Sequence, residues 1–166
     1  MPSCVLEIKA EFENVERMTP APGDVMWKFD IENEAGERKE GITVDPNDEE
    51  QEIEGGKGFA HFVMKWNKGD KHQAYIKITP IGKAKKGATG TYSTPGEWQP
   101  VCAFECRGLK IIRWIPGNDF EVTSSCGQVF KAEDVPFSPD EPDWYDVDEN
   151  NESVSVTELQ GRIRDI

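Results

Sequence analysis

Cysteine and histidine are the side chains of this sequence best suited to bind a metal ion or act as nucleophiles. The chain has four cysteines and two histidines. Cys102 and Cys106 lie four apart in a stretch that predicts a strand, so their side chains share a face roughly 13 Å apart along it. That separation is too large for one tetrahedral ion. We therefore expect both residues to be buried as small apolar side chains.

The two histidines, His61 and His72, fall at predicted strand positions on either side of a turn. One alternative has them face each other and, with Glu32, bind a metal ion weakly. Two imidazoles without nearby thiolates make a poor site, and histidines packed in a core or at its rim are more common than ligands. The sequence therefore favours a structural role for both.

Known catalytic signatures are absent, including Gly-x-Ser-x-Gly and His-Glu-x-x-His. The glycine-rich run 55–58 lacks the Lys-Ser/Thr pair of a phosphate-binding loop. In an enzymatic alternative, Glu105, Arg107 and Asp119 would supply acid–base or oxyanion groups in a cleft. Glu105 and Arg107 are two apart on one strand face, as in a structural cross-strand ion pair. We expect a protein without enzymatic activity.

Alternating apolar and polar residues predict that most of the chain forms β-strands. The clearest alternation covers residues 6–13, with Leu6, Ile8, Ala10 and Phe12 inward. Two β-hairpins and a last strand follow from the same pattern, and helix is expected only as a short turn near 132–134 or at the chain end. The predicted ranges are a hairpin over 25–44 turning at 33–36, a hairpin over 59–78 turning at 67–70, and a strand over 153–159.

The second half of the sequence repeats features of the first. When Val101 is set beside Val5, the same offset places Arg113 beside Arg17 and Pro116 beside Pro20. The length suits one folding unit. We predict an all-β fold in which two similar antiparallel halves pack as one sandwich- or barrel-like unit. The predicted parts are an N-terminal half over 1–81, a linker over 82–98 and a C-terminal half over 99–166.

Composition narrows the possible partners. A net charge of −13 argues against a nucleic-acid or anionic-membrane binder, because binding phosphates requires clustered Lys and Arg. The chain lacks an apolar run of about 20 residues and the order of a signal peptide, so we expect a cytoplasmic, reduced protein. Seven lysines against one acid lie between Lys65 and Lys86, which indicates either a solvated face or a basic ridge for an acidic partner.

Several stretches together carry a resemblance to a known family. They are residues 6–15, Trp27, the run 55–58 with Ala60, Asp143-Trp144, and above all Phe104-Glu105-Cys106-Arg107-Gly108-Leu109. With these stretches the sequence resembles the eukaryotic CXXC-motif-containing zinc-binding proteins, a small, mostly β family of uncharacterised function. The resemblance extends over nearly the whole chain.

The resemblance implies a zinc site that this sequence does not carry. In the family, two Cys-x-x-Cys pairs at the tips of two N-terminal hairpins together hold one structural zinc ion. The matching positions here are Glu32 and Ala35 on the first tip and Trp66 and Gly69 on the second. None is cysteine, so we expect no bound zinc, and the stability that a closed Cys₄ site supplies must come from elsewhere.

The family resemblance leads to a hypothesis about how the tips are held and what the protein does. We expect an ion pair between Glu32 or Glu34 and Lys65 or Lys68, with the Trp66 ring covering the gap. We expect a divergent, monomeric member of the family that acts as a protein-binding or adaptor module. The expected interaction surface comprises Lys65, Trp66, Lys68, Lys71 and Trp98.

Overall fold

The computed structural model describes residues 3–21, 25–46, 51–53, 58–79 and 90–166, which form an almost entirely β structure. The elements of the first half are β1 (Ser3–Glu13), β2 (Val15–Pro20), β3 (Trp27–Glu32), β4 (Arg38–Val44), β5 (Gln51–Glu52), β6 (Phe59–Ala60), β7 (Phe62–Met64) and β8 (Ala74–Thr79). Those of the second half are β9 (Gln99–Arg107), β10 (Lys110–Trp114), β11 (Phe120–Ser124), β12 (Val129–Phe130), the 3₁₀ turn η2 (Ala132–Asp134), β13 (Trp144–Val147) and β14 (Ser153–Asp165). The all-β prediction and the short helical turn near 132–134 are confirmed. No helix in these ranges has the length and apolar character needed to cross a bilayer.

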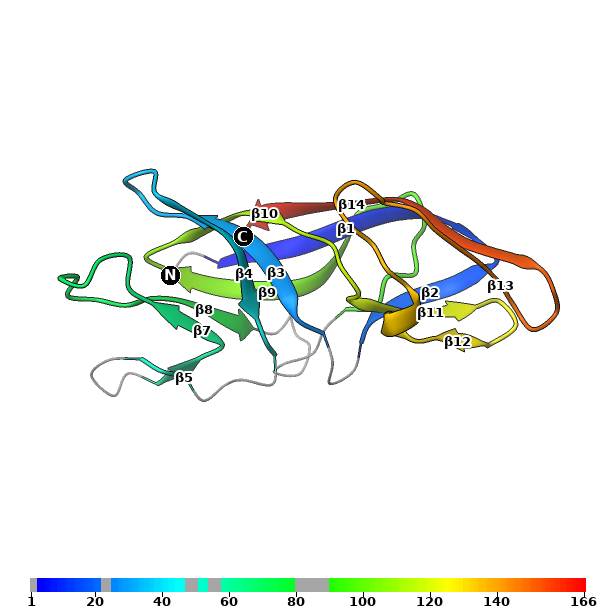
Figure 1. The fold of residues 1–166 in the computed structure, drawn as a ribbon, viewed down its shortest axis with the longest axis horizontal. Coiled ribbons are helices and arrows are strands. Elements are labelled where there is room, and N and C mark those ends of the chain that lie inside the picture. The colour runs from blue at the N-terminus through cyan, green and yellow to red at the C-terminus, as the bar shows by residue number, and fades with distance from the viewer. Residues whose placement is uncertain (1–2, 22–24, 47–50, 54–57, 80–89) are drawn as a thin grey trace.

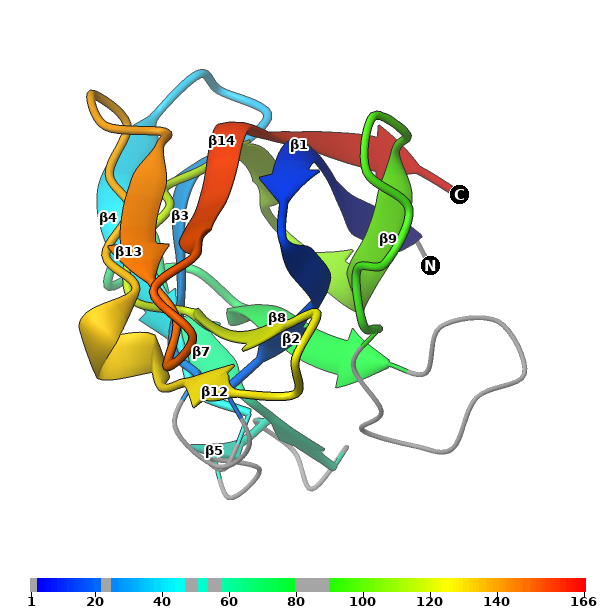
Figure 2. The ribbon, with the colours of Figure 1, turned by 90° about the vertical axis from the view of Figure 1, so that its right-hand side faces the viewer.

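The strands form one large antiparallel sheet and three small ones. The large sheet has the order β13-β14-β1-β9-β8-β7, and the smaller ones are β10-β3-β4, β12-β11-β2 and the pair β5-β6. Viewed along the long axis of the molecule, the strands surround the core (Figure 2). This is the sandwich- or barrel-like arrangement expected from the sequence.

The core is built from the inward residues of the predicted alternation. Leu6 and Ile8 of β1 are fully buried, as are Trp27, Phe29 and Ile31 of β3. The ring of Phe29 packs edge-on against Phe104 of β9, with centroids 5.1 Å apart, which joins the small sheet to the large one. Each such buried side chain contributes about 1.5–3 kcal/mol by leaving water. The first predicted strand and the first predicted hairpin are therefore confirmed.

The two halves of the chain are interleaved about the central pair β1 and β9. The last strand of the first half, β8, pairs with β9, and the last strand of the second half, β14, pairs with β1. In the same way β3 pairs with β10, and β11 pairs with β2. Each of these pairings joins one strand of the first half to one strand of the second. The similarity of the two halves stays a prediction.

The boundary between the halves lies partly outside the described residues. Of the predicted linker over 82–98, residues 82–89 fall outside them. The rest includes Tyr92, which is fully buried and whose hydroxyl donates to the Glu97 carbonyl at 2.7 Å. Its backbone also pairs with Met18 of β2. Residues 90–98 are therefore tied to the body of the protein, and the exact division of the chain stays a prediction.

The second hairpin is more broken than the alternation predicts. The expected strand over 59–66 is divided into β6 and β7 at His61, and Trp66 lies beyond the end of β7. The interruption is caused by a side chain that accepts a backbone hydrogen bond in place of a backbone carbonyl. The buried His61 ring accepts the Ile78 amide at its Nδ1, 2.9 Å away, so the strand is interrupted there.

The last strand is longer than predicted. We expected it to end at residue 159, with a helix at the chain end as an alternative, but β14 continues to Asp165. Beyond residue 159 its register pairs Gly161 with Ile8 and Ile163 with Leu6. These extra pairs, with Ile163 packed against the core, keep the segment extended, so the helical alternative is wrong.

Candidate functional site

The tips of the first two hairpins lie at the same end of the molecule (Figure 1). Residues of both tips line one pocket. The first tip, residues 33–36, joins β3 to β4, and the second tip, residues 67–70, joins β7 to β8. The pocket has a volume of about 1060 Å³. The ends of β1, β9, β10 and β14 complete its walls, so it is assembled from both halves of the chain.

The pocket combines an apolar interior with acidic residues. Its apolar lining comprises Cys4, Trp66, Cys106, Leu109, Ile111 and Ile163. Its charged lining comprises five acids and one base, Glu32, Glu34, Glu37, Asp70, Asp165 and Lys110. Concave surfaces with one sign of charge concentrate the field, so this pocket attracts cations.

Polar side chains shape each tip locally. On the first tip the Asn33 Oδ1 accepts the backbone amides of Ala35 and Glu37 at 3.0 and 2.9 Å, and Gly36 has a φ of +83°. On the second tip the Asp70 Oδ2 accepts the Asn67 amide at 3.0 Å. Asn, Asp and Gly are the residues that favour such turns, because they satisfy backbone groups locally or allow positive φ.

Trp66 connects the second tip to the turn after β9. Its indole Nε1 donates to the Gly108 carbonyl at 2.9 Å, and the residue lines the pocket together with Glu32 and Ala35 of the first hairpin. Gly108 has a φ of +72°, and a Cβ there would lie 3.1 Å from that of Ala74. The backbone conformation and the close approach of Ala74 therefore explain why the Phe104–Leu109 motif has glycine at this position. The expectation that Trp66 covers the space between the tips stays a prediction.

The positions that the resemblance assigns to zinc do not fit that ion. Of Glu32, Ala35, Trp66 and Gly69, only Glu32 carries a side chain that binds zinc. Its carboxylate lies 3.8 Å from the guanidinium of Arg38 on the same hairpin. In the part of the chain that the structure describes, no three His, Cys, Asp or Glu side chains converge on a metal position. The hydrogen bond from Trp66 to the Gly108 carbonyl fixes the second hairpin to the turn after β9.

The alternative metal site of His61, His72 and Glu32 does not form. His61 is buried with its Nδ1 bonded to the Ile78 amide, whereas His72 is exposed near the second tip. The prediction that the histidines face each other is wrong, because β7 pairs Phe62 with Ile76 and Met64 with Ala74, which places His61 beside β8 and leaves His72 before that strand begins.

The three residues of the enzymatic alternative do not share the pocket. Glu105 pairs in register with Lys77 of β8, on the outer face of the large sheet. Arg107 pairs in the same way with Tyr75. Asp119 is buried in the turn between β10 and β11, where its Oδ2 accepts the Gly117 amide at 3.0 Å. Burial raises the pKa of Asp119 to about 7, against the smaller effect of that hydrogen bond.

The expected interaction surface is divided between two places. Lys65, Lys68 and Lys71 are exposed on the second hairpin, beside Trp66. Trp98 precedes β9, whereas Trp66 contacts Gly108 just after β9 ends, so the two tryptophans lie at opposite ends of that strand. They do not form one patch.

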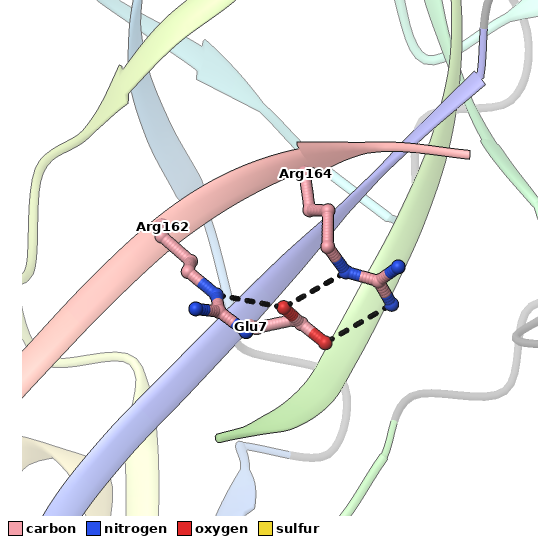
Figure 3. Close-up of polar contacts among 3 residues, drawn as sticks. All are labelled: Glu7, Arg162 and Arg164. Carbon is pink, nitrogen blue, oxygen red and sulfur yellow. Dashed lines mark hydrogen bonds and ion pairs between the residues drawn. The ribbon is translucent and has the colours of Figure 1, made fainter.

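A buried ion cluster, missed by the sequence patterns, joins the first and last strands on the outer face of the large sheet (Figure 3). The Glu7 Oε1 accepts Arg162 Nε at 2.8 Å and Arg164 Nε at 3.0 Å, and its Oε2 accepts Arg164 Nη2 at 3.1 Å. Arg162 also stacks on the Trp98 ring at 4.2 Å. Burial raises the pKa of Glu7, but the hydrogen bonds and charges of the two arginines outweigh it, so the pKa lies below its ordinary value.

Alternation predicted a solvated Glu7, yet only 5% of the residue is exposed. The signal that could have located the cluster is the spacing of Arg162 and Arg164, which puts both on one face of the last strand. Oppositely charged side chains on neighbouring strands attract each other, so two arginines on one face favour a carboxylate on the strand beside them.

The predicted burial of Cys102 and Cys106 is confirmed, and Cys4 is buried beside them. Cys126 is exposed, and in the described residues all four are free thiols. Burial raises the pKa of Cys102. Cys4 and Cys106 differ from Cys102 because both line the pocket.

Comparison with known proteins defines the class to which this fold belongs. The sequence matches the family described as CXXC motif containing zinc binding protein, eukaryotic, over residues 5–164. The chain belongs to this family.

Its relatives are similar over their whole length. A mouse CXXC motif containing zinc binding protein is 26% identical over 96% of both chains. Among solved structures, a hypothetical protein from Plasmodium falciparum has a TM-score of 0.84 at 26% identity, covering 99% of this chain and 100% of that one. The crystal structure of C1orf123 has a TM-score of 0.79 at 25% identity, covering 99% of both chains. The family and fold expected from the sequence are confirmed.

Proposed function

We propose that this protein is a non-enzymatic, monomeric, cytoplasmic protein-binding module that works without the structural zinc of its family. The observation that supports the proposal is the pocket between the two hairpin tips. It is lined by residues of both tips although the positions corresponding to the zinc ligands hold Glu32, Ala35, Trp66 and Gly69. Trp66 lines this pocket and donates a hydrogen bond to the Gly108 carbonyl, which fixes its side chain there.

The character of the pocket favours another protein as its occupant. Covering the apolar interior of the pocket lowers the free energy of the complex, and the acidic lining orients a cationic side chain of the partner. Binding modules combine an apolar centre with a polar rim in this way. The partner is therefore expected to insert an apolar side chain flanked by lysine or arginine.

Site-specific photo-crosslinking tests the binding role. Benzoylphenylalanine is placed at Ala35, which lines the pocket, and in a control variant at Val129, which is exposed on β12 of another sheet. We expect a discrete covalent adduct with one cellular protein from position 35 and none from position 129. Equal labelling from both positions, or none from position 35, would contradict the proposal.

Elemental analysis and thermal denaturation test whether the protein lacks bound zinc. Elemental analysis of the purified protein after a chelator wash should find zinc far below one equivalent, and added zinc should leave the melting temperature unchanged. One retained equivalent of zinc would overturn this part of the proposal and leave the binding role to the crosslinking result.

A further inference from the structure

Two buried thiols face each other from neighbouring strands at the floor of the pocket. Cys4 of β1 pairs in register with Phe104 of β9, so Cys106 lies two residues further along β9, diagonally opposite Cys4. Both side chains are on the inner face, are 6% and 4% exposed, and line the pocket. The strand register therefore places the two side chains next to each other at the base of the pocket.

Their spacing disfavours a disulfide. Diagonal neighbours in an antiparallel pair have Cα atoms about 7–8 Å apart. A disulfide generally needs about 4.4–6.8 Å, and bridging a larger gap requires the backbone to move. The central strands β1 and β9 are each paired on both sides and resist such a movement. The two thiols are therefore diagonal neighbours whose strands the sheet holds too far apart for a disulfide.

A sulfur pair of this kind suits one class of ion. Zinc in a structural site takes four ligands, and no third His, Cys, Asp or Glu side chain among the described residues converges with these thiols on a metal position. Thiolates select soft ions, and among first-row metals Cu(I) is the soft ion that accepts two sulfur ligands. The acidic lining raises the local concentration of a cation that enters from solvent.

We propose that Cys4 and Cys106 form a two-sulfur binding site for Cu(I) at the base of the pocket. Each thiol gives up its proton to solvent as its sulfur bonds the ion, so one Cu(I) displaces two protons and copper keeps its oxidation state. The proposal goes beyond the protein-binding role and does not depend on it.

Anaerobic competition against a coloured Cu(I) chelator measures the site. We expect the wild-type protein to take one equivalent of Cu(I) from bicinchoninate. Cys4→Ser and Cys106→Ser should each weaken the affinity at least tenfold, whereas Cys126→Ser, which removes the exposed thiol, should leave it unchanged. Failure to compete, or loss of binding in Cys126→Ser alone, would overturn the proposal.

A second measurement uses only the wild-type chain, so it holds even where a core variant does not fold. The protein is alkylated with N-ethylmaleimide under partially unfolding conditions, with and without one equivalent of Cu(I), and the modified cysteines are mapped by mass spectrometry. Bound Cu(I) should protect Cys4 and Cys106 and leave Cys102 and Cys126 unprotected. Equal labelling with and without Cu(I), or protection of Cys126 only, would contradict a site at the sulfur pair. These readouts involve neither zinc nor a protein partner, so their failure is distinct from failure of the proposed function.

Discussion

Glu7 is held by two arginines of the last strand, so its charge controls how firmly β14 is attached to β1. The carboxylate is nearly inaccessible, whereas the side chains of Arg162 and Arg164 keep 45% and 53% of their surface exposed. An unpaired buried carboxylate would be costly, and here three charge-assisted hydrogen bonds compensate it. The cluster therefore stabilises the sheet as long as Glu7 is ionised.

The Glu7→Gln variant should lose about 1–2 kcal/mol of unfolding free energy at neutral pH, because the amide replaces charge-assisted bonds by weaker ones. The folded pKa of Glu7 lies below its reference value of 4.5. The stabilisation is therefore fully present above that value and is lost as the pH falls through the lower folded pKa. Urea denaturation at neutral and at strongly acidic pH should show the difference from wild type shrinking in acid.

Glu11→Gln is the matched control, since Glu11 lies on the same face of β1 but is exposed. Its unfolding free energy should change little at either pH. A Glu7→Gln difference that is equally large in acid would show that the effect comes from shape and not from charge.

At the scale of elements, Gly161 allows β14 to lie against β10. A Cβ at this position would overlap the Trp114 ring, with the ring Cζ3 only 2.8 Å away. Gly161 pairs with Ile8 in the large sheet, whereas Trp114 belongs to a small one. The absence of a side chain at Gly161 therefore lets the Trp114 ring lie against the backbone of β14.

The Gly161→Ala variant should lose about 1–3 kcal/mol, because the added methyl group forces the sheets apart or the ring out of its rotamer. Gly69→Ala is the control, since a Cβ there meets nothing within 4 Å. Thermal denaturation of both variants decides the matter, and equal melting temperatures would refute a packing role for Gly161.

Strands β1 and β3 could be predicted from the sequence because apolar side chains that enter the core recur at every second residue. The break at His61 could not, since it depends on a ring nitrogen finding the Ile78 amide on a neighbouring strand. The pocket could be predicted only in part, because the family resemblance placed Glu32 and Trp66 near each other but did not indicate the lining residues from β1, β9 and β14. Cys4 and Cys106 are about a hundred residues apart in the sequence and become neighbours only when β1 pairs with β9. Local sequence patterns do not predict such a pairing.

At the scale of the whole molecule, interleaving makes each half depend on the other. The four central strands of the large sheet, in the order β14, β1, β9 and β8, come alternately from the second and the first half of the chain. Neither half can bury its central strand alone. The molecule should therefore unfold as one unit although the sequence repeats itself.

We expect one cooperative unfolding transition in urea, with coincident curves from tryptophan fluorescence and far-ultraviolet circular dichroism. Ile76→Ala, at a fully buried position of β8, should lower both midpoints equally and cost about 2–5 kcal/mol. Two separate transitions, or a shift in only one probe, would show that the halves unfold independently.

The same interleaving matters while the chain is being made on the ribosome. Strand β1 is synthesised first, but its two neighbours in the sheet are β9 and β14, which begin at Gln99 and Ser153. At about 5–20 residues per second, roughly 4–17 s pass before the first neighbour is complete enough to pair. Throughout that time an apolar strand with both edges open is exposed to other nascent chains, so this protein depends on protection during translation more than its finished fold suggests.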